Sequence, residues 1–189
     1  MGSKRLIAPL TERWNEGERD WSYVADPSKD IARWEHDTKQ KLPDGYRRFM
    51  LKFNGGRVYP RLFRYKVPLE RYPSNEPVTM VDPFYDWAYV EAHWRGEVYG
   101  KGTPPDMLII GTNPGGLQIL LSLRPVDRGH IFCWPHTSNF WGTEGNTQVW
   151  HQADSFETFL ESLYDEPDGS DYAFWREPFD DELVRPLVF

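Results

Sequence analysis

The amino-acid sequence predicts an α+β fold, a single domain in which helices flank a largely antiparallel central sheet. Residues 43–53 carry apolar side chains at helical spacing, and residues 106–123 hold two apolar runs on either side of a tight turn. Along the chain the expected order is helix, helix, strands, helix, hairpin, strand and helix. A chain of 189 residues is long enough for one domain with a buried core.

The first helix is expected from about residue 27 to residue 39. Asp26 followed by proline is typical of a helix start, with the aspartate as the N-cap and the proline in the first helical position. Ile31, Trp34 and Thr38 fall on one face of that helix.

The second helix is the clearest element of the sequence. Pro43 can begin it, and the run Asn54-Gly55-Gly56 supplies residues that tolerate a left-handed backbone at its end. The apolar side chains between them recur at i, i+3, i+4 and i+7, which predicts a buried stripe made of Tyr46, Phe49, Met50 and Phe53.

Strands and two further helices complete the expected fold. A strand region follows from 57 to 67, a short strand and helix lie within 78–95, and another strand begins at Gly129. A last strand from about residue 148 leads into a helix for which Asp154 and Glu157 can form a capping box. The buried stripe of this helix is expected to be Phe156, Phe159, Leu160 and Leu163.

The segment 106–123 also contains the glycine spacing that opens a phosphate-binding P-loop, from Gly111 to Gly116. A P-loop continues with lysine and then serine or threonine at the start of a helix, whereas this chain has Leu117 and Gln118 in those positions. The residues after the glycines alternate as in a strand. The sequence therefore predicts a β-hairpin and no nucleotide site.

Composition and charge narrow the function. The net charge is −7, from 29 acidic and 22 basic residues, which argues against a general nucleic-acid-binding protein. No apolar run has the length of a membrane span, and the N-terminus lacks the apolar core of a signal peptide. Cys133, the single cysteine, excludes an intramolecular disulfide and fits a reducing compartment. We expect a cytoplasmic protein.

Two arrangements of reactive residues allow for an enzyme or a metal site. His130, Cys133 and His136 are spaced H-x-x-C-x-x-H, with His151 further on, and zinc uses such ligands. In a strand, however, Cys133 would lie on the face opposite the two histidines. Cys133 as a nucleophile would need a base and an accessible site, whereas buried cysteine is the commoner state.

The acidic residues also offer candidate pairs for acid–base catalysis. Asp82 with Asp86, or Asp127 with His130, could act together, but such pairs arise by chance in an acidic chain. No G-x-S-x-G motif of a serine hydrolase is present. We therefore expect no catalytic residues, no cofactor and no metal, and keep a small metal-dependent enzyme as the competing hypothesis.

The chain contains L-P-x-x-Y followed by F-x-x-x-x-N-G-G, from Leu42 to Gly56, and the hairpin and the motif A-x-S-F-x-x-F-L come after it in the sequence. With these motifs in this order, residues from about Ile31 to Leu163 resemble the SUKH superfamily, which includes fungal cell-wall-assembly regulators of the Smi/Knr type and bacterial immunity proteins. The resemblance implies a domain over 27–165. Residues 1–26 are then an N-terminal extension packed on that domain, and residues 166–189 are an acidic and aromatic C-terminal extension.

The resemblance implies an immunity protein that binds a cognate bacterial toxin domain, from a polymorphic or contact-dependent system and possibly a nuclease, and occludes its active site. A regulatory protein-binding scaffold is the alternative. The expected partner is a basic protein toxin, with no direct contact to nucleic acid or membrane, and a monomer is favoured. Aromatic and acidic residues typical of interfaces predict the contact set: Asp82, Tyr85, Asp86, Trp87, Glu91, Phe140, Trp141 and Glu144.

Overall fold

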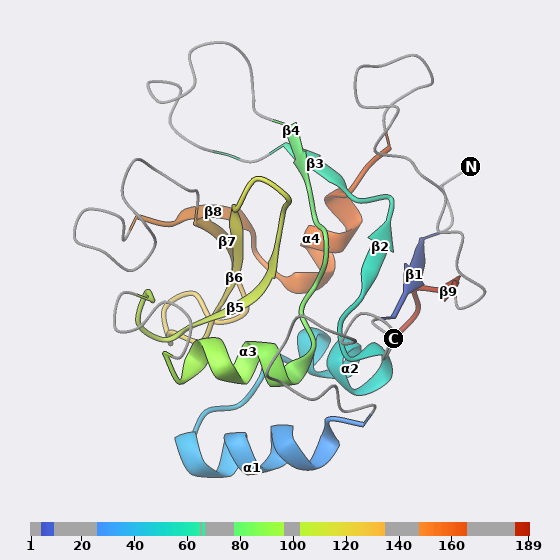
Figure 1. Ribbon diagram of the computed structural model, residues 1–189. Coiled ribbons are helices and arrows are strands. Elements are labelled where there is room, and N and C mark those ends of the chain that lie inside the picture. The colour runs from blue at the N-terminus through green and yellow to red at the C-terminus, as the bar shows by residue number, and fades with distance from the viewer. Residues whose placement is uncertain are drawn as a thin grey trace.

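A computed structural model describes residues 5–9, 26–64, 66, 78–96, 103–134, 148–165 and 184–189. These residues form an α+β fold with four helices and three antiparallel sheets (Figure 1). The helices are α1 (Ser28–Thr38), α2 (Asp44–Phe53), α3 (Trp87–Trp94) and α4 (Phe156–Ser162). Within this described part, no helix has the length and hydropathy needed to cross a membrane.

The largest sheet contains four strands in the order β5-β6-β7-β8, all antiparallel, which confirms the predicted sheet. Its strands are β5 (Met107–Thr112), β6 (Gln118–Ser122), β7 (Ile131–Trp134) and β8 (Trp150–Ala153). Nearly every residue of β5, β6 and β7 is buried. Helix α3 packs on β5, and α4 packs on β8 and α2, so this sheet lies at the centre of the fold.

Two smaller sheets adjoin it. One pairs β3 (Leu62–Arg64) with β4 (Val78–Met80), and the other has the order β2-β1-β9, made of β2 (Arg57–Tyr59), β1 (Leu6–Ala8) and β9 (Arg185–Pro186). Phe84 bridges the sheets because it pairs with Gly56 on one side and with Gly111 on the other. The strand expected over 57–67 is thus two strands of different sheets, separated at Pro60, which lacks a backbone donor.

The predicted hairpin of β5 and β6 is confirmed. Asn113 closes its turn: its side-chain Oδ1 accepts a hydrogen bond from the Leu117 N–H at 2.6 Å, and its own N–H donates to the Leu117 carbonyl at 3.1 Å. The chain continues from this turn directly into strand β6. No helix follows that could present its N-terminus to a phosphate.

The core is rich in aromatic rings that contact one another in tilted or edge-to-face arrangements. All four residues of the predicted α2 stripe are buried, and Phe49 packs against Phe53, Phe84 and Phe156 at centroid distances of 5.0–5.7 Å. The predicted α4 stripe is also buried in full. These stripes confirm that helical periodicity identified the inward faces of both helices.

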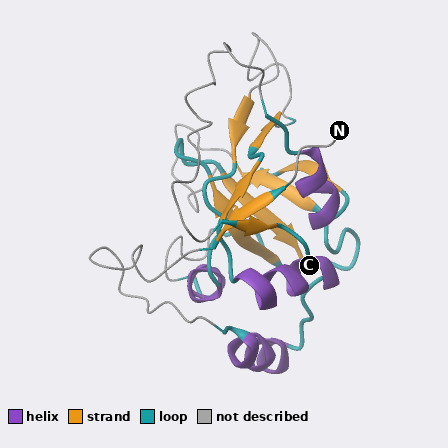
Figure 2. Ribbon diagram, turned by 90° about the vertical axis from the view of Figure 1, so that its right-hand side faces the viewer, coloured by secondary structure: helices purple, strands orange, loops and turns teal. Residues whose placement is uncertain are grey.

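Helix α1 lies beyond α2 and α3, on the side away from the sheets, in both views (Figures 1 and 2). Trp34 packs edge to face on Trp87 and Trp94 of α3, at 5.5 and 5.4 Å. Buried Glu35 links α1 to the chain before α2, since its carboxylate accepts from the Leu42 N–H at 3.0 Å. Lys41 and Arg47 add ion pairs to this carboxylate at 3.2 and 3.4 Å.

Two helix starts differ by one residue from the sequence prediction. Ser155, and not Asp154, is the N-cap of α4, and its hydroxyl accepts a hydrogen bond from the Thr158 N–H at 3.0 Å. Helix α1 begins at Ser28, whose N–H donates to Asp26 at 3.0 Å. At α4 the neighbouring polar side chains of Asp154 and Ser155 compete for the cap, whereas the N-cap of α1 is Pro27, which makes no side-chain hydrogen bond. Periodicity decides neither start.

The described ends of the chain are part of the fold. Strand β1 pairs with both β2 and β9, and the Arg5 side chain donates to the Leu160 and Glu161 carbonyls at the end of α4. The ring of Phe189 contacts Phe49 at 5.6 Å. The domain boundaries expected from the sequence remain a prediction.

Candidate functional site

Three of the predicted contact residues lie inside the protein, at the start of α3. Tyr85, Asp86 and Trp87 are 6%, 5% and 2% exposed. Asp86 is the N-cap of α3, where its carboxylate accepts from the Tyr89 N–H at 3.0 Å. This carboxylate therefore satisfies a helix-terminal donor. The burial of all three explains by packing inside the protein why this segment is rich in aromatic residues.

The two acidic residues on either side of this group form ion pairs with arginines. Asp82 contacts Arg57 at 2.8 Å and Arg61 at 3.1 Å. Glu91 contacts Arg95 at 3.1 Å and Arg33 at 3.5 Å. Each acidic side chain is 14% exposed, so a partner would contact only the small exposed part of that side chain.

The other predicted contact residues, Phe140, Trp141 and Glu144, lie outside the described residues. The structure thus brings five of the predicted contact residues together around the start of α3, where their main role is to stabilise the fold: Asp82, Tyr85, Asp86, Trp87 and Glu91. That a partner contacts any of the eight stays a prediction.

The residues considered for catalysis are held in structural roles. Cys133 is fully buried in β7, and burial raises the pKa of its thiol well above the usual range. Burial also raises the pKa of Asp127, but hydrogen bonds from Arg124 and Ser122 outweigh it and lower that pKa overall. A protonated buried thiol is a poor nucleophile, and a carboxylate with a lowered pKa is a weak base.

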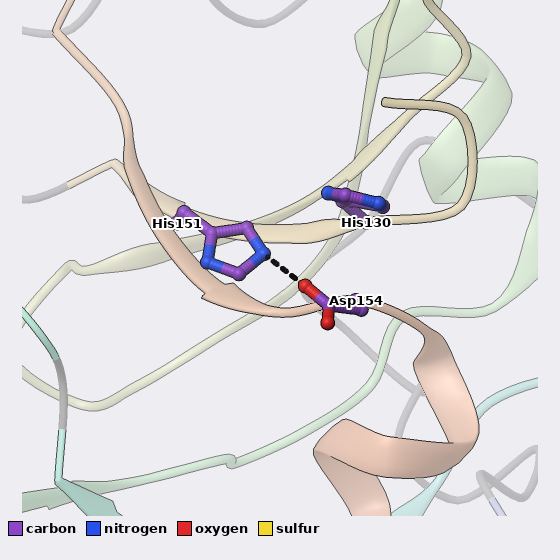
Figure 3. Close-up of side chains that lie close together, drawn as sticks. All are labelled: His130, His151 and Asp154. Atoms are coloured by element: carbon purple, nitrogen blue, oxygen red, sulfur yellow. Dashed lines mark ion pairs between the residues drawn. The ribbon is translucent and has the colours of Figure 1, made fainter. Parts of the chain in front are cut away.

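The sheet separates Cys133 from the described histidines considered for zinc. Cys133 faces the core, while His130, just before β7, lies beside His151 of β8 with ring centroids 5.2 Å apart. His136 lies outside the described residues. Asp154 joins the two histidines, and its Oδ1 lies 3.0 Å from His151 Nε2 (Figure 3). Sequence reasoning named both histidines but missed Asp154 as their neighbour.

A cleft of about 480 Å³ opens between β3, β8 and the end of α4. Lys66 and Gln152 hold one wall together: the Lys66 N–H donates to Gln152 Oε1 at 2.9 Å, and Gln152 Nε2 donates back to the Lys66 carbonyl at 3.1 Å. No motif marked this cleft in the sequence, because its lining comes from three separate segments: Phe63, Arg64, Lys66, Gln152, Phe159, Ser162, Tyr164 and Asp165.

The sequence model of the SMI1 / KNR4 family (SUKH-1) matches residues 27–162, from the start of α1 to the end of α4. The chain belongs to the SMI1 / KNR4 family (SUKH-1). This confirms the resemblance to the SUKH superfamily. No curated protein sequence matches the chain.

The N-G-G signature of this SUKH-1 domain shapes the backbone between α2 and β2. Asn54 ends α2 in a left-handed conformation, and its side chain accepts a hydrogen bond from the Trp87 N–H at 2.8 Å. Gly55 has φ of +83°, and a Cβ there would lie 2.5 Å from the Tyr85 carbonyl oxygen. The signature therefore holds α2 against the segment that enters α3, a structural role.

Proposed function

We propose that this SUKH-1 protein is an immunity protein. It binds a cognate bacterial toxin domain, from a polymorphic or contact-dependent system, and neutralises it in the cytoplasm by occluding its active site. Membership of the SUKH-1 family carries this proposal. Binding without chemistry is the mechanism, so the protein needs neither a cofactor nor a catalytic residue of its own.

The state of the reactive side chains supports binding over catalysis. Cys133 is buried in β7, and Asp82 is held by two arginines. Neither is an accessible nucleophile or base in the described part of the chain. A toxin would be blocked by contact area and charge, which a rigid domain of this size can supply.

The charge distribution supports a basic partner. Residues 166–183 hold seven acidic residues and one arginine, which accounts for nearly all of the net charge of −7. Acidic surfaces attract basic proteins at long range and raise the rate of encounter. A nuclease, which must itself attract nucleic acid, is a partner of suitable charge.

Aromatic anchors are the second part of the proposed interface. Phe140 and Trp141, with Glu144 nearby, combine large apolar area with negative charge, the composition of interface hot spots. Within the described segment 82–91, Glu91 and Asp82 are the residues with partly exposed charge, and they would lie at the rim of a contact. Rim charges affect mainly the association rate.

The test is an affinity pull-down of the tagged full chain from its native cells, with bound proteins identified by mass spectrometry. We expect one stoichiometric partner with a toxin-like C-terminal domain. Phe140→Ala/Trp141→Ala should weaken its binding by at least about 2 kcal/mol, roughly thirtyfold. Val126→Ala, at a side chain 87% exposed in the described part, is the matched control and should bind normally.

Two outcomes would count against the proposal, and a third would count against the chosen interface residues. A partner without a toxin domain, such as a cell-wall or signalling protein, would favour the regulatory scaffold. No partner at all, in native cells in which the gene next to this one is expressed and encodes a protein with a C-terminal toxin domain, would contradict binding as the function. Loss of binding in the Val126→Ala control as well would mean that the chosen residues do not mark the interface.

A further inference from the structure

His130, His151 and Asp154 bring three metal-ligating side chains together on one side of strands β7 and β8 (Figure 3). One ligand atom from each lies within 4.8 Å of the others, and His151 Nε2 is 3.0 Å from Asp154 Oδ1. Among the described residues, this is the group of three or more histidine, cysteine, aspartate or glutamate side chains whose ligand atoms lie this close together. Nothing in the proposed immunity function uses it.

The separations suit coordination. Zinc binds nitrogen and oxygen at about 2.0–2.2 Å, so two ligand atoms of a tetrahedral site lie about 3.3 Å apart. His151 and Asp154 are already close to that separation, at 3.0 Å. The ligand atom of His130 lies within 4.8 Å of the other two, so it must approach them by at most about 1.5 Å to reach that spacing.

The backbone holds all three residues in place. The His130 N–H donates to the Asp127 carbonyl at 3.0 Å, and its carbonyl accepts from Ser122 at 3.0 Å. His151 is paired across the sheet with Phe132, whose ring contacts it edge to face at 5.5 Å. Asp154 directly precedes the N-cap of α4. Ligands fixed by strands and a helix start lose little freedom when an ion binds.

The site is open to solvent, so an ion can enter it. The side chains of His151 and Asp154 are 41% and 80% exposed. Two imidazoles and one carboxylate are ligands that zinc, nickel and copper accept, whereas magnesium and calcium prefer sites built of oxygen. Three protein ligands also leave a fourth position for water or for a group from another molecule.

We propose that His130, His151 and Asp154 form a binding site for one divalent transition-metal ion, for which zinc is the test ion. The site departs from the expectation of no metal, and it differs from the H-x-x-C-x-x-H set because buried Cys133 takes no part. Asp154 replaces the thiolate as the anionic ligand. An ion here ties the edge strand β8 and the start of α4 to β7.

The test is calorimetric titration of the untagged, EDTA-treated full chain with ZnCl₂. His130→Gln, His151→Gln and Asp154→Asn are the ligand variants. His36→Gln is the matched control, because His36 lies 2.9 Å from Asp37 in an exposed ion pair that belongs to no group of three ligands among the described residues. Circular dichroism confirms that each variant is folded.

We expect one zinc ion per chain with micromolar affinity. Each ligand variant should weaken this binding at least about tenfold, while the control leaves it unchanged. Asp154→Asn is decisive because an amide still hydrogen-bonds to His151 but binds zinc poorly. Co²⁺ should give the visible absorption of a tetrahedral site without a thiolate charge-transfer band. No saturable binding, or equal binding by all variants, would overturn the site and leave only an ion pair.

Discussion

Asn54 connects the end of α2 with the start of α3, and its replacement by alanine should destabilise the protein substantially. The residue is 2% exposed, and its side chain accepts the hydrogen bond from the Trp87 N–H at 2.8 Å. Its own N–H donates to the Met50 carbonyl at 2.9 Å, and its backbone has φ of 48° and ψ of 51°. Alanine would lose the acceptor and keep the unfavourable backbone conformation.

The magnitude follows from these two effects. A buried N–H left without its acceptor costs about 1–3 kcal/mol. A left-handed backbone costs an ordinary residue about 1–2 kcal/mol, whereas asparagine and glycine adopt it readily. Asn54→Ala should therefore lower the free energy of unfolding by about 2–5 kcal/mol. Asn54→Gly should cost only the first part, because glycine avoids the backbone penalty.

Urea unfolding followed by tryptophan fluorescence measures both variants, since the chain has nine tryptophans. We expect the order of stability to be the parent protein, then Asn54→Gly, then Asn54→Ala. An alanine variant as stable as the glycine variant would refute the role of the left-handed backbone. Losses below about 0.5 kcal/mol in both variants would refute the role of the buried hydrogen bond.

Three further changes test the fold in the same unfolding assay. Gly55→Ala should lower the free energy of unfolding by more than about 1–2 kcal/mol, because the strain of a left-handed backbone is added to the clash of a Cβ 2.5 Å from a carbonyl oxygen. An unchanged unfolding midpoint would contradict this. Phe189→Ala should lower the free energy of unfolding by about 1–3 kcal/mol, because its ring contacts with the aromatic residues of α2 are lost. Val188→Ala, at a side chain that is 66% exposed, should lower it little. Equal losses would argue against packing of the C-terminus. Burial raises the pKa of Glu35, but the Leu42 N–H and two basic side chains outweigh it, so the folded pKa is lowered. The stability that ionised Glu35 contributes is therefore present above the unfolded pKa of about 4.3 and lost as the pH falls through the folded pKa. Glu35→Gln should be less stable than the parent protein at pH 7, and this difference in stability should fade in acid. A difference that stays constant with pH would contradict the linkage.

Local periodicity was enough to predict the helices that face the core. The spacing of Tyr46, Phe49, Met50 and Phe53 identified the inward face of α2, and all four residues are buried. The turn chemistry between β5 and β6 identified the hairpin in the same way. Both features are set by neighbours in sequence, so a single chain contains the information needed to predict them.

Pairings between distant segments could not be predicted in this way. Strands β1, β2 and β9 contain only two or three residues each, too few for an alternating pattern, and their partners lie far apart in the sequence. The dense aromatic residues near α3 suggested a surface because charges accompany them. In the structure, Trp87 packs on Trp34 of α1 instead, and Asp86 caps a helix.

The cluster of His130, His151 and Asp154 depends on the register between β7 and β8. Fifteen residues separate these strands, and the pairing shifts by one position between Ile131 and Phe132. A slip of one residue would send the His151 side chain to the other face of the sheet. No local pattern specifies that register, so the two histidines could be noticed in the sequence but not placed side by side.

Neutralisation of a toxin is the central claim, and a growth assay tests it most directly. The toxin domain captured with this protein is expressed under tight control in a sensitive bacterial strain, with or without the full chain. We predict that the chain restores growth and forms a stable complex with the toxin domain, and that Phe140→Ala/Trp141→Ala restores growth less well. Continued growth arrest, with the chain folded and present in excess over the toxin, would contradict the claim.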